Sequence, residues 1–139
     1  MIAARQIQHI SIPRPPGSEA LTRAFYGDLL GLEEVPVPQS IQHLDLMWFR
    51  LGNMELHLFA EDPIEDPSGR HFCFVVDNVK AAWDRLAEAG YAPWDTIPIP
   101  GRPRFFCRDP FNNTIEFATI EGNYLELEAQ ANGNVSATG

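Results

Sequence analysis

Basic residues, cysteine and long apolar runs are all scarce in this sequence of 139 residues. Ten Lys and Arg stand against 19 Asp and Glu, which gives a net charge of −9. Because binding to phosphates requires clustered Lys and Arg, this charge argues against nucleic acid as a partner and disfavours anionic membrane surfaces. No apolar run approaches the length of a membrane span, so no membrane partner is expected.

The cysteine content is equally informative. Cys73 and Cys107 lie in apolar, strand-like runs without CxxC spacing, a pattern that predicts two buried free thiols. The N-terminal sequence lacks the apolar core of a signal peptide, so we expect a cytoplasmic protein. The residues are 45% apolar and 21% charged, which is typical of a soluble globular domain that buries its own core.

The first half of the chain alternates between strand and helix patterns. A strand is predicted at residues 6–12, with His9 and Ser11 on one face, and a helix follows from its N-cap Ser18 to Gly31. Three extended segments are then predicted at residues 35–38, 44–51 and 54–59, the last two forming a hairpin around Gly52-Asn53.

The second half follows the same order after an acidic, proline-containing linker at residues 60–69. A strand begins at His71, and Asp77-Asn78 caps a helix that closes at Gly90. Extended segments follow at 94–99, 104–108 and 114–120. Beyond Glu121 the sequence is rich in Gly, Asn, Ser and Ala, and we expect the end of this segment to be disordered.

The two halves match in spacing as well as in order. His9 and His71 lie 62 residues apart, Glu55 and Glu116 lie 61 apart, and the glycines that end the two helices lie 59 apart. This agreement predicts an internal duplication. A duplicated sheet that curls around one cavity brings all four polar side chains together.

Two imidazoles and two carboxylates are a donor set suited to a divalent first-row ion such as Zn, Ni, Co, Mn or Fe. A single strand histidine is more often a hydrogen-bonded structural residue, and a single strand glutamate usually faces water. The equivalent positions in the two halves favour the metal site over these readings.

Four stretches resemble the vicinal oxygen chelate superfamily, which includes glyoxalase I, methylmalonyl-CoA epimerase, extradiol dioxygenases and the fosfomycin and bleomycin resistance proteins. The resemblance covers about residues 6 to 121. It rests on these stretches: Gln8-His9-Ile10, the FYGDLLGL run at 25–32, residues 71–78, and RDPFNNTIE at 108–116.

The resemblance implies an α+β fold in which two βαβββ modules, at about 6–60 and 70–121, form a curled mixed sheet around a metal-binding cleft. The helices lie outside, and residues 122–139 form a separate C-terminal segment. It further implies metal ligands at His9, His71 and Glu116, with a fourth at Glu55. His57 lies on the same strand face as Glu55 and is the alternative fourth ligand; the repeat favours Glu55, since His57 pairs by spacing with Ala118.

The implied function is that of a metal-dependent lyase or isomerase resembling glyoxalase I, acting on a small substrate that chelates the metal through vicinal oxygens. Glu116 and Glu55 are the candidate catalytic carboxylates. An extradiol-type dioxygenase and a drug-binding or drug-modifying resistance protein are the alternatives. A homodimer is expected from the resemblance. The candidate substrate-binding residues are His57, Trp48, Arg104 and Arg102, with Arg108 in the same arginine cluster.

Overall fold

The computed structural model describes residues 1–62 and 69–138, which belong to two compact units. Unit 1 comprises Met1–Pro67 with Pro110–Asn113, and unit 2 comprises Ser68–Asp109 with Thr114–Gly139. The predicted linker at 60–69 falls mostly on residues 63–68, outside the described part of the chain. The division agrees with a chain built from two similar halves.

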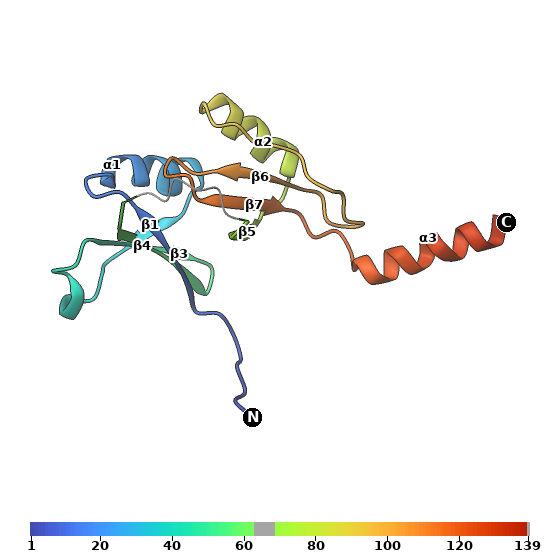
Figure 1. Ribbon diagram of the computed structural model, residues 1–139, viewed down its shortest axis with the longest axis horizontal. Coiled ribbons are helices and arrows are strands. Elements are labelled where there is room, and N and C mark those ends of the chain that lie inside the picture. Colours follow the sequence, from blue (N-terminus) through green and yellow to red (C-terminus); the bar gives the residue numbers. More distant parts are fainter. Residues whose placement is uncertain (63–68, 139) are drawn as a thin grey trace. The chain divides into compact units, whose positions relative to one another are not determined.

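Unit 1 is built on a four-stranded mixed sheet with the order β1-β4-β3-β2 (Figure 1). β1 (His9–Arg14) runs parallel to β4 (Met54–Ala60), which pairs antiparallel with β3 (Leu46–Leu51). β2 (Glu33–Val35) forms the edge beside β3. The predicted hairpin is confirmed: Gly52, with φ 59°, begins the turn between Leu51 and Met54.

The helical segment of unit 1 combines two kinds of helix. α1 (Glu19–Thr22) continues directly into the π-helix η1 (Arg23–Leu29), and a 3-10 turn, η2 (Gln39–Ile41), follows β2. The predicted helix position and its N-cap residue, Ser18, are confirmed. The Ser18 side chain makes no hydrogen bond to the helix, because its hydroxyl donates to the Pro15 carbonyl (2.5 Å). The rings of Phe25 and Tyr26 in η1 are buried, and the centroid of the Tyr26 ring lies 6.1 Å from that of Phe49 in the sheet.

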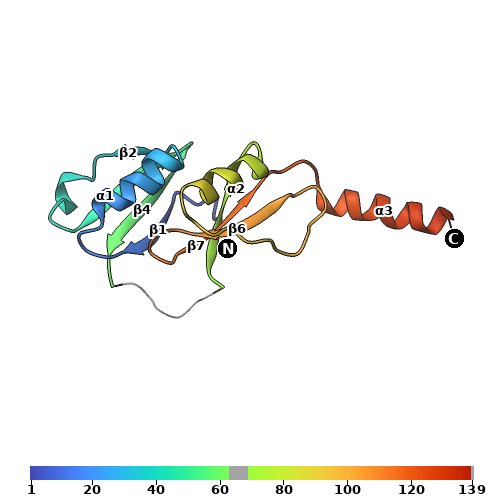
Figure 2. The same cartoon turned by 90° about the horizontal axis from the view of Figure 1, so that it is seen from above.

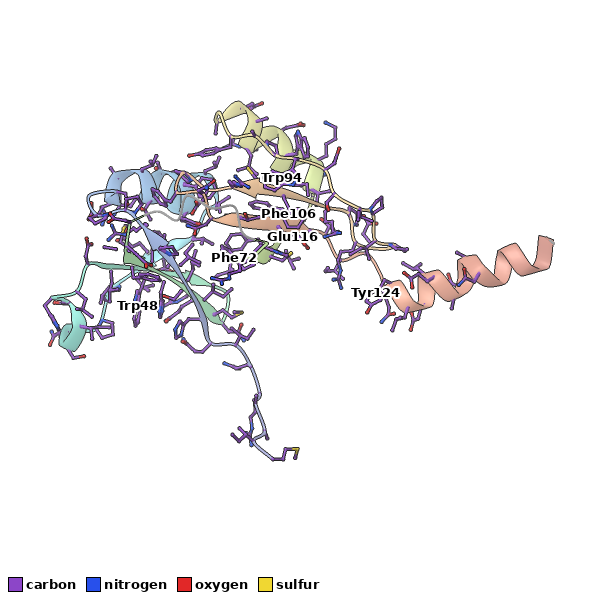
Figure 3. The ribbon with its side chains drawn as sticks, in the orientation of Figure 1. Trp48, Phe72, Trp94, Phe106, Glu116 and Tyr124 are labelled. Carbon is purple, nitrogen blue, oxygen red and sulfur yellow. The ribbon has the colours of Figure 1, made fainter. Side chains whose placement is uncertain are left out.

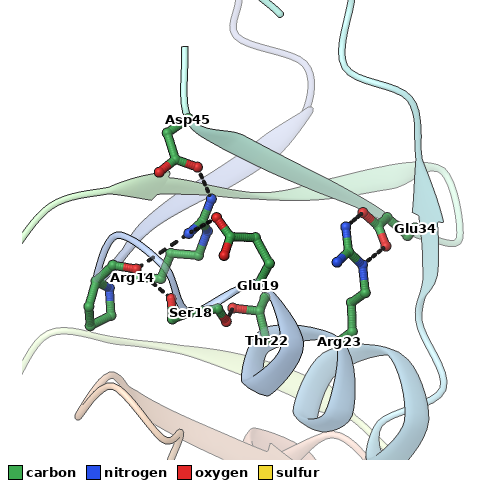
Figure 4. A network of polar contacts seen from close by, with 8 residues as sticks. Arg14, Ser18, Glu19, Thr22, Arg23, Glu34 and Asp45 are labelled. Atoms are coloured by element: carbon green, nitrogen blue, oxygen red, sulfur yellow. Dashed lines mark hydrogen bonds and ion pairs between the residues drawn. The ribbon is translucent and has the colours of Figure 1, made fainter. Parts of the chain in front are cut away.

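A fully buried arginine fastens the start of this helix to the sheet. Arg14, at the end of β1, has a side chain with no exposure and forms ion pairs with Asp45 and Glu19 (Figure 4). Its Nη1 also donates to the Pro15 carbonyl (3.3 Å). Beside it, the Thr22 hydroxyl donates to the Ser18 carbonyl (2.8 Å). A buried charge is tolerated here because two carboxylates lie against it.

Unit 2 repeats the arrangement with a three-stranded sheet of order β5-β7-β6. β5 (His71–Val75) runs parallel to β7 (Thr114–Ala118), and β6 (Arg104–Arg108) pairs antiparallel with β7. α2 (Val79–Glu88) packs on β6 and β7, as Figure 2 also shows. The predicted cap is confirmed, since the Asn78 side chain accepts a hydrogen bond from the Ala81 N–H (2.9 Å).

The strand predicted at 94–99 is reduced to isolated bridges. Trp94 pairs with Phe106 and Ile99 with Arg102. Pro98 and Pro100 lack the N–H donors that a continuous ladder needs, and this explains the interruption.

The C-terminal segment forms α3 (Tyr124–Thr138). The Asn123 side chain accepts hydrogen bonds from the N–H groups of Leu125 (3.0 Å) and Glu126 (3.2 Å), which starts the helix where the sequence looked loop-like. Gly101 lies under this helix at φ 71°, where a Cβ would come within 2.5 Å of the Leu127 side chain.

The fold class is therefore confirmed as α+β, with a strand–helix–strand pattern in both units. Among the described residues, no helix has the length and apolar character needed to cross a membrane.

Candidate metal centre

The polar candidates of unit 1 share one face of its sheet. Side chains alternate between faces along a strand, so the buried Leu56 and Leu58 point to the helix side while Glu55 and His57 point to the other. In the strand register His9 lies opposite Glu55, and Trp48 lies opposite His57. Three strands thus place four candidates side by side.

His57 is held on both ring faces. Trp48 stacks on it with ring centroids 3.7 Å apart and an interplanar angle of 4°, and His9 lies 4.2 Å away at 18°. The stack leaves His57 only 7% exposed. The indole of Trp48 therefore packs against the His57 imidazole and fixes its orientation. It does not face a cleft as a ring without a stacking partner.

The Glu55 carboxylate forms hydrogen bonds with the side chains of His57 and Gln8. His57 Nε2 lies 2.9 Å from Glu55 Oε1, and Gln8 also hydrogen-bonds the Glu55 carboxylate. These two hydrogen bonds, from His57 first and Gln8 second, lower the pKa of Glu55 below its ordinary value. Gln8 Oε1 is in turn 2.7 Å from His9 Nδ1. Glu55 is thus ionised and already engaged with its neighbours.

In unit 2, Glu116 stands in a row of four side chains across the sheet. Cys73 lies opposite Glu116 on β5. Phe106 lies opposite Glu116 on β6, and Trp94 follows beside Phe106 (Figure 3). The Phe106 and Trp94 rings stack with centroids 5.7 Å apart. His71, further along β5, meets the edge of Phe106 at 5.0 Å.

Glu116 is 8% exposed, and its Oε1 atom lies close to an arginine and a histidine. Arg104 Nη1 donates to Glu116 Oε1 (3.0 Å), and His71 Nε2 lies 3.4 Å from the same atom. Arg104 Nη2 also donates to the Ile97 carbonyl (2.8 Å). Arg104 is therefore positioned to orient Glu116, and its expected contact with substrate stays a prediction.

The other arginines are placed differently from one another. Arg102 lies over the Tyr124 ring at 5.8 Å, and Arg108 lies over the Trp94 ring at 5.6 Å. An open pocket of about 460 Å³ adjoins Trp94; it is lined by Gly90, Tyr91, Ala92, Trp94, Arg108 and Asp109. Phe106 and Trp94 were not among the expected site residues. The sequence did hold a signal for Phe106, because it lies two residues from both Arg104 and Arg108 and therefore on the same strand face.

The structure brings the predicted ligands together within each unit as one histidine and one glutamate. Within residues 1–62 and 69–138, no three His, Cys, Asp or Glu side chains are grouped as a metal cage. The donors nevertheless fit a divalent ion chemically. His9 Nδ1 contacts Gln8 Oε1, and His71 Nδ1 lies 3.0 Å from the Gly69 carbonyl oxygen. An imidazole that donates from Nδ1 has its lone pair on Nε2, which is the nitrogen a metal requires.

The strand registers change the correspondence between the halves. With His9 equivalent to His71, the residue of unit 1 that corresponds to Glu116 is His57, because His57 lies opposite Ser11 and Trp48 as Glu116 lies opposite Cys73 and Phe106. Glu55 corresponds to Thr114, the register partner of His71. The pairing of Glu55 with Glu116 by spacing arises from loops of different length: Gly52-Asn53 connect one hairpin, and residues 109–113 the other.

Two strand–helix–strand units, each built on a small mixed sheet, are the architecture of the vicinal oxygen chelate proteins. The chain belongs to the glyoxalase/bleomycin resistance protein/dioxygenase superfamily, whose family model matches residues 6–117. No curated protein sequence matches it.

Solved structures agree with this membership. A glyoxalase family protein from Bacillus anthracis is 32% identical, with 86% of this chain and 98% of that chain covered and a TM-score of 0.78. The fosfomycin resistance protein FosX from Listeria monocytogenes is similar in fold at 17% identity, with coverage of 88% and 94% and a TM-score of 0.70. Lactoylglutathione lyase from Agrobacterium tumefaciens is 23% identical, with coverage of 84% and 95% and a TM-score of 0.65.

Proposed function

We propose that this chain is a metal-dependent lyase or isomerase that acts on a small substrate with two vicinal oxygens. One observation carries the proposal: His9 and His71 each have Nδ1 held by an oxygen acceptor, which directs the lone pair to Nε2. Both histidines lie on the sheet face that also carries a glutamate. His9, His71 and Glu116 would hold the ion, with Glu55 or His57 as the fourth donor.

A bound divalent ion of the first row would supply Lewis acidity, which stabilises negative charge on substrate oxygens. Glu116 would take a proton from substrate carbon at its carboxylate and return it to a neighbouring atom. Arg104 keeps that carboxylate oriented through its hydrogen bond to Oε1. The low exposure of Glu116 limits competition from water for the same proton.

Substrate selection is proposed to involve Trp48, Arg102 and the loops at 39–43 and 99–103. Arg102 carries a charge suited to a carboxylate-bearing substrate and sits in the second of these loops. Glu55 stays a second candidate for proton transfer. A homodimer and a cytoplasmic location stay predictions of the sequence.

The experiment is metal analysis of purified wild type beside His71→Ala and Glu116→Ala, with Glu33→Gln as the control for an exposed carboxylate on β2. We expect wild type and the control to bind one divalent ion per chain, and both site variants to lose most of it. Full metal occupancy in both variants would contradict the assignment. A substrate panel of hemithioacetals, catechols and fosfomycin then separates the isomerase function from the dioxygenase and resistance alternatives.

A further inference from the structure

The open pocket beside Trp94 lies next to the row of side chains that contains Glu116. Its volume of about 460 Å³ is in the range of small-molecule sites. The walls come from residues 90–92 and 94, which follow α2, and from residues 108–109 at the end of β6. All of them belong to unit 2, so one compact unit forms the whole pocket.

Trp94 is the flat apolar wall of this pocket, and it is held firmly. Its N–H donates to the Phe106 carbonyl (2.8 Å), and the Phe106 N–H donates to the Trp94 carbonyl (3.0 Å). The two rings also stack, with an interplanar angle of 21°. The indole nevertheless stays 39% exposed. A rigidly held, partly exposed indole is a surface on which a planar ring can stack.

Arg108 supplies a positive charge beside this indole, with its guanidinium 5.6 Å from the centre of the Trp94 ring. The other arginines of the cluster are placed elsewhere: Arg104 donates to a carboxylate within the sheet, and Arg102 lies over Tyr124. Arg108 is the member of the cluster that lines the pocket. A guanidinium binds a carboxylate through two parallel hydrogen bonds, so the pocket suits an aromatic ring that carries a carboxylate.

The two remaining polar side chains of the pocket are consistent with an anion. Asp109 is only 4% exposed, so it presents little of its own charge to a ligand. Burial first, and the charge of Asp109 second, raise the pKa of Tyr91 above its ordinary value. The Tyr91 phenol therefore keeps its proton well above neutral pH, and a protonated phenol can donate to a carboxylate oxygen.

We infer that this pocket binds an aromatic carboxylate, with the ring stacked on Trp94 and the carboxylate paired with Arg108. Trp94 lies two strand positions from Glu116, across Phe106, which is about 10 Å at the usual strand spacing (Figure 3). A substrate that reaches Glu116 can therefore place its far end in the pocket. As a substrate subsite the pocket rests on the proposed function, whereas binding of the carboxylate itself requires no metal ion.

The test is calorimetric titration of the full, metal-free chain with cinnamate, a planar aromatic carboxylate. Cinnamamide has the same ring without the charge, and cinnamylammonium reverses the charge. We expect cinnamate to bind about tenfold or more tightly than cinnamamide, because only cinnamate forms a hydrogen bond between charged groups. Cinnamylammonium should bind more weakly still. Absence of saturable cinnamate binding, or equal or tighter binding of either analogue, overturns the inference.

Two variants separate the contributions of charge and ring. Arg108→Met removes the guanidinium but keeps most of the side-chain length, and it should weaken cinnamate about 10-fold to 100-fold while leaving cinnamamide unchanged. Trp94→Leu removes the stacking surface and should weaken both compounds. Arg85→Met is the matched control, since Arg85 is an exposed arginine on α2 outside the pocket, and it should match wild type. A cinnamate affinity that is equal in Arg108→Met and Arg85→Met overturns the inference.

If either pocket variant does not fold, NMR of the wild-type chain answers the same question. Cinnamate should shift the backbone N–H resonances of residues 90–92, 94, 108 and 109, together with the indole N–H of Trp94. Shifts confined to other residues overturn the inference. A chain that binds a divalent ion but no cinnamate overturns this inference alone, whereas a chain that binds cinnamate here but no divalent ion overturns only the proposed function.

Discussion

Arg104 and Glu116 form a hydrogen-bonded ion pair across two adjacent strands, with 3.0 Å between Nη1 and Oε1 and with both side chains largely buried. The pair determines which way the candidate catalytic carboxylate points. Sequence alone assigned the arginine to substrate and the glutamate to metal, whereas the structure connects the two directly.

Replacing Arg104 by Met should reduce divalent-ion affinity about tenfold, because Glu116 loses the donor that orients it. Loss of a hydrogen bond between charged groups should also lower the free energy of unfolding by about 1–3 kcal/mol. Calorimetric metal titration and urea denaturation measure the two effects. Arg102→Met is the control, since Arg102 faces Tyr124; equal losses in both variants would show a general effect of arginine removal.

The Arg14 cluster predicts an asymmetry between its members. Asp45→Ala should destabilise the protein by about 2–4 kcal/mol, because it leaves a fully buried guanidinium with Glu19 as its remaining carboxylate, at 3.5 Å. Arg14→Met should cost less, since Asp45 and Glu19 are both partly exposed and can be hydrated. Urea denaturation of the two variants decides the matter, and a larger loss for Arg14→Met would contradict this account.

Burial raises the pKa of the Cys107 thiol to about 11, above the ordinary value of 9.0 for an exposed thiol. Between these values the unfolded chain releases the proton and the folded chain keeps it, so the free energy of unfolding should fall as pH rises from about 9 to 11. The loss for this thiol should reach about 2–3 kcal/mol. Cys107→Ala should show a shallower alkaline decline in denaturation experiments across that pH range, and an equally steep decline would refute the assignment.

Asn78→Ala should lower the free energy of unfolding by about 1 kcal/mol, because it removes the side-chain acceptor for the Ala81 N–H at the start of α2. Asn78→Asp retains an acceptor and should be close to wild type. Thermal denaturation followed by circular dichroism compares them, and a loss shared by both variants would point to a role other than capping.

Local signals predicted the elements of the fold well. Period-two alternation placed β1, β4 and β5, and the residues at 52–53 and 78 marked a turn and a helix start. The π-helix at 23–29 and the helix at 124–138 were missed, since the first differs from an α-helix only in its hydrogen-bond register and the second follows a segment rich in turn-forming residues.

The residues of the candidate site could be predicted from the sequence, but the contacts between them could not. Polar residues between apolar ones identified His9, His71, Glu55 and Glu116, and the structure places each pair on one sheet face. The residue of unit 1 that corresponds to Glu116 depends on the strand register. The two hairpins have loops of different length, so sequence spacing does not give that register. Likewise, no local pattern shows that Arg104 reaches Glu116, because twelve residues and a hairpin separate them.

Gly101 connects two parts of unit 2 that the sequence treated separately. Its carbonyl accepts hydrogen bonds from the N–H groups of Glu121 (2.8 Å) and Gly122 (3.3 Å), and Leu127 covers its Cα. The loop at 99–103 is therefore clamped by the chain that leads into α3. Changes to the C-terminal helix should therefore alter the conformation of this loop. In protein engineering, affinity tags belong at the N-terminus, and a truncation that removes Leu127 releases the loop.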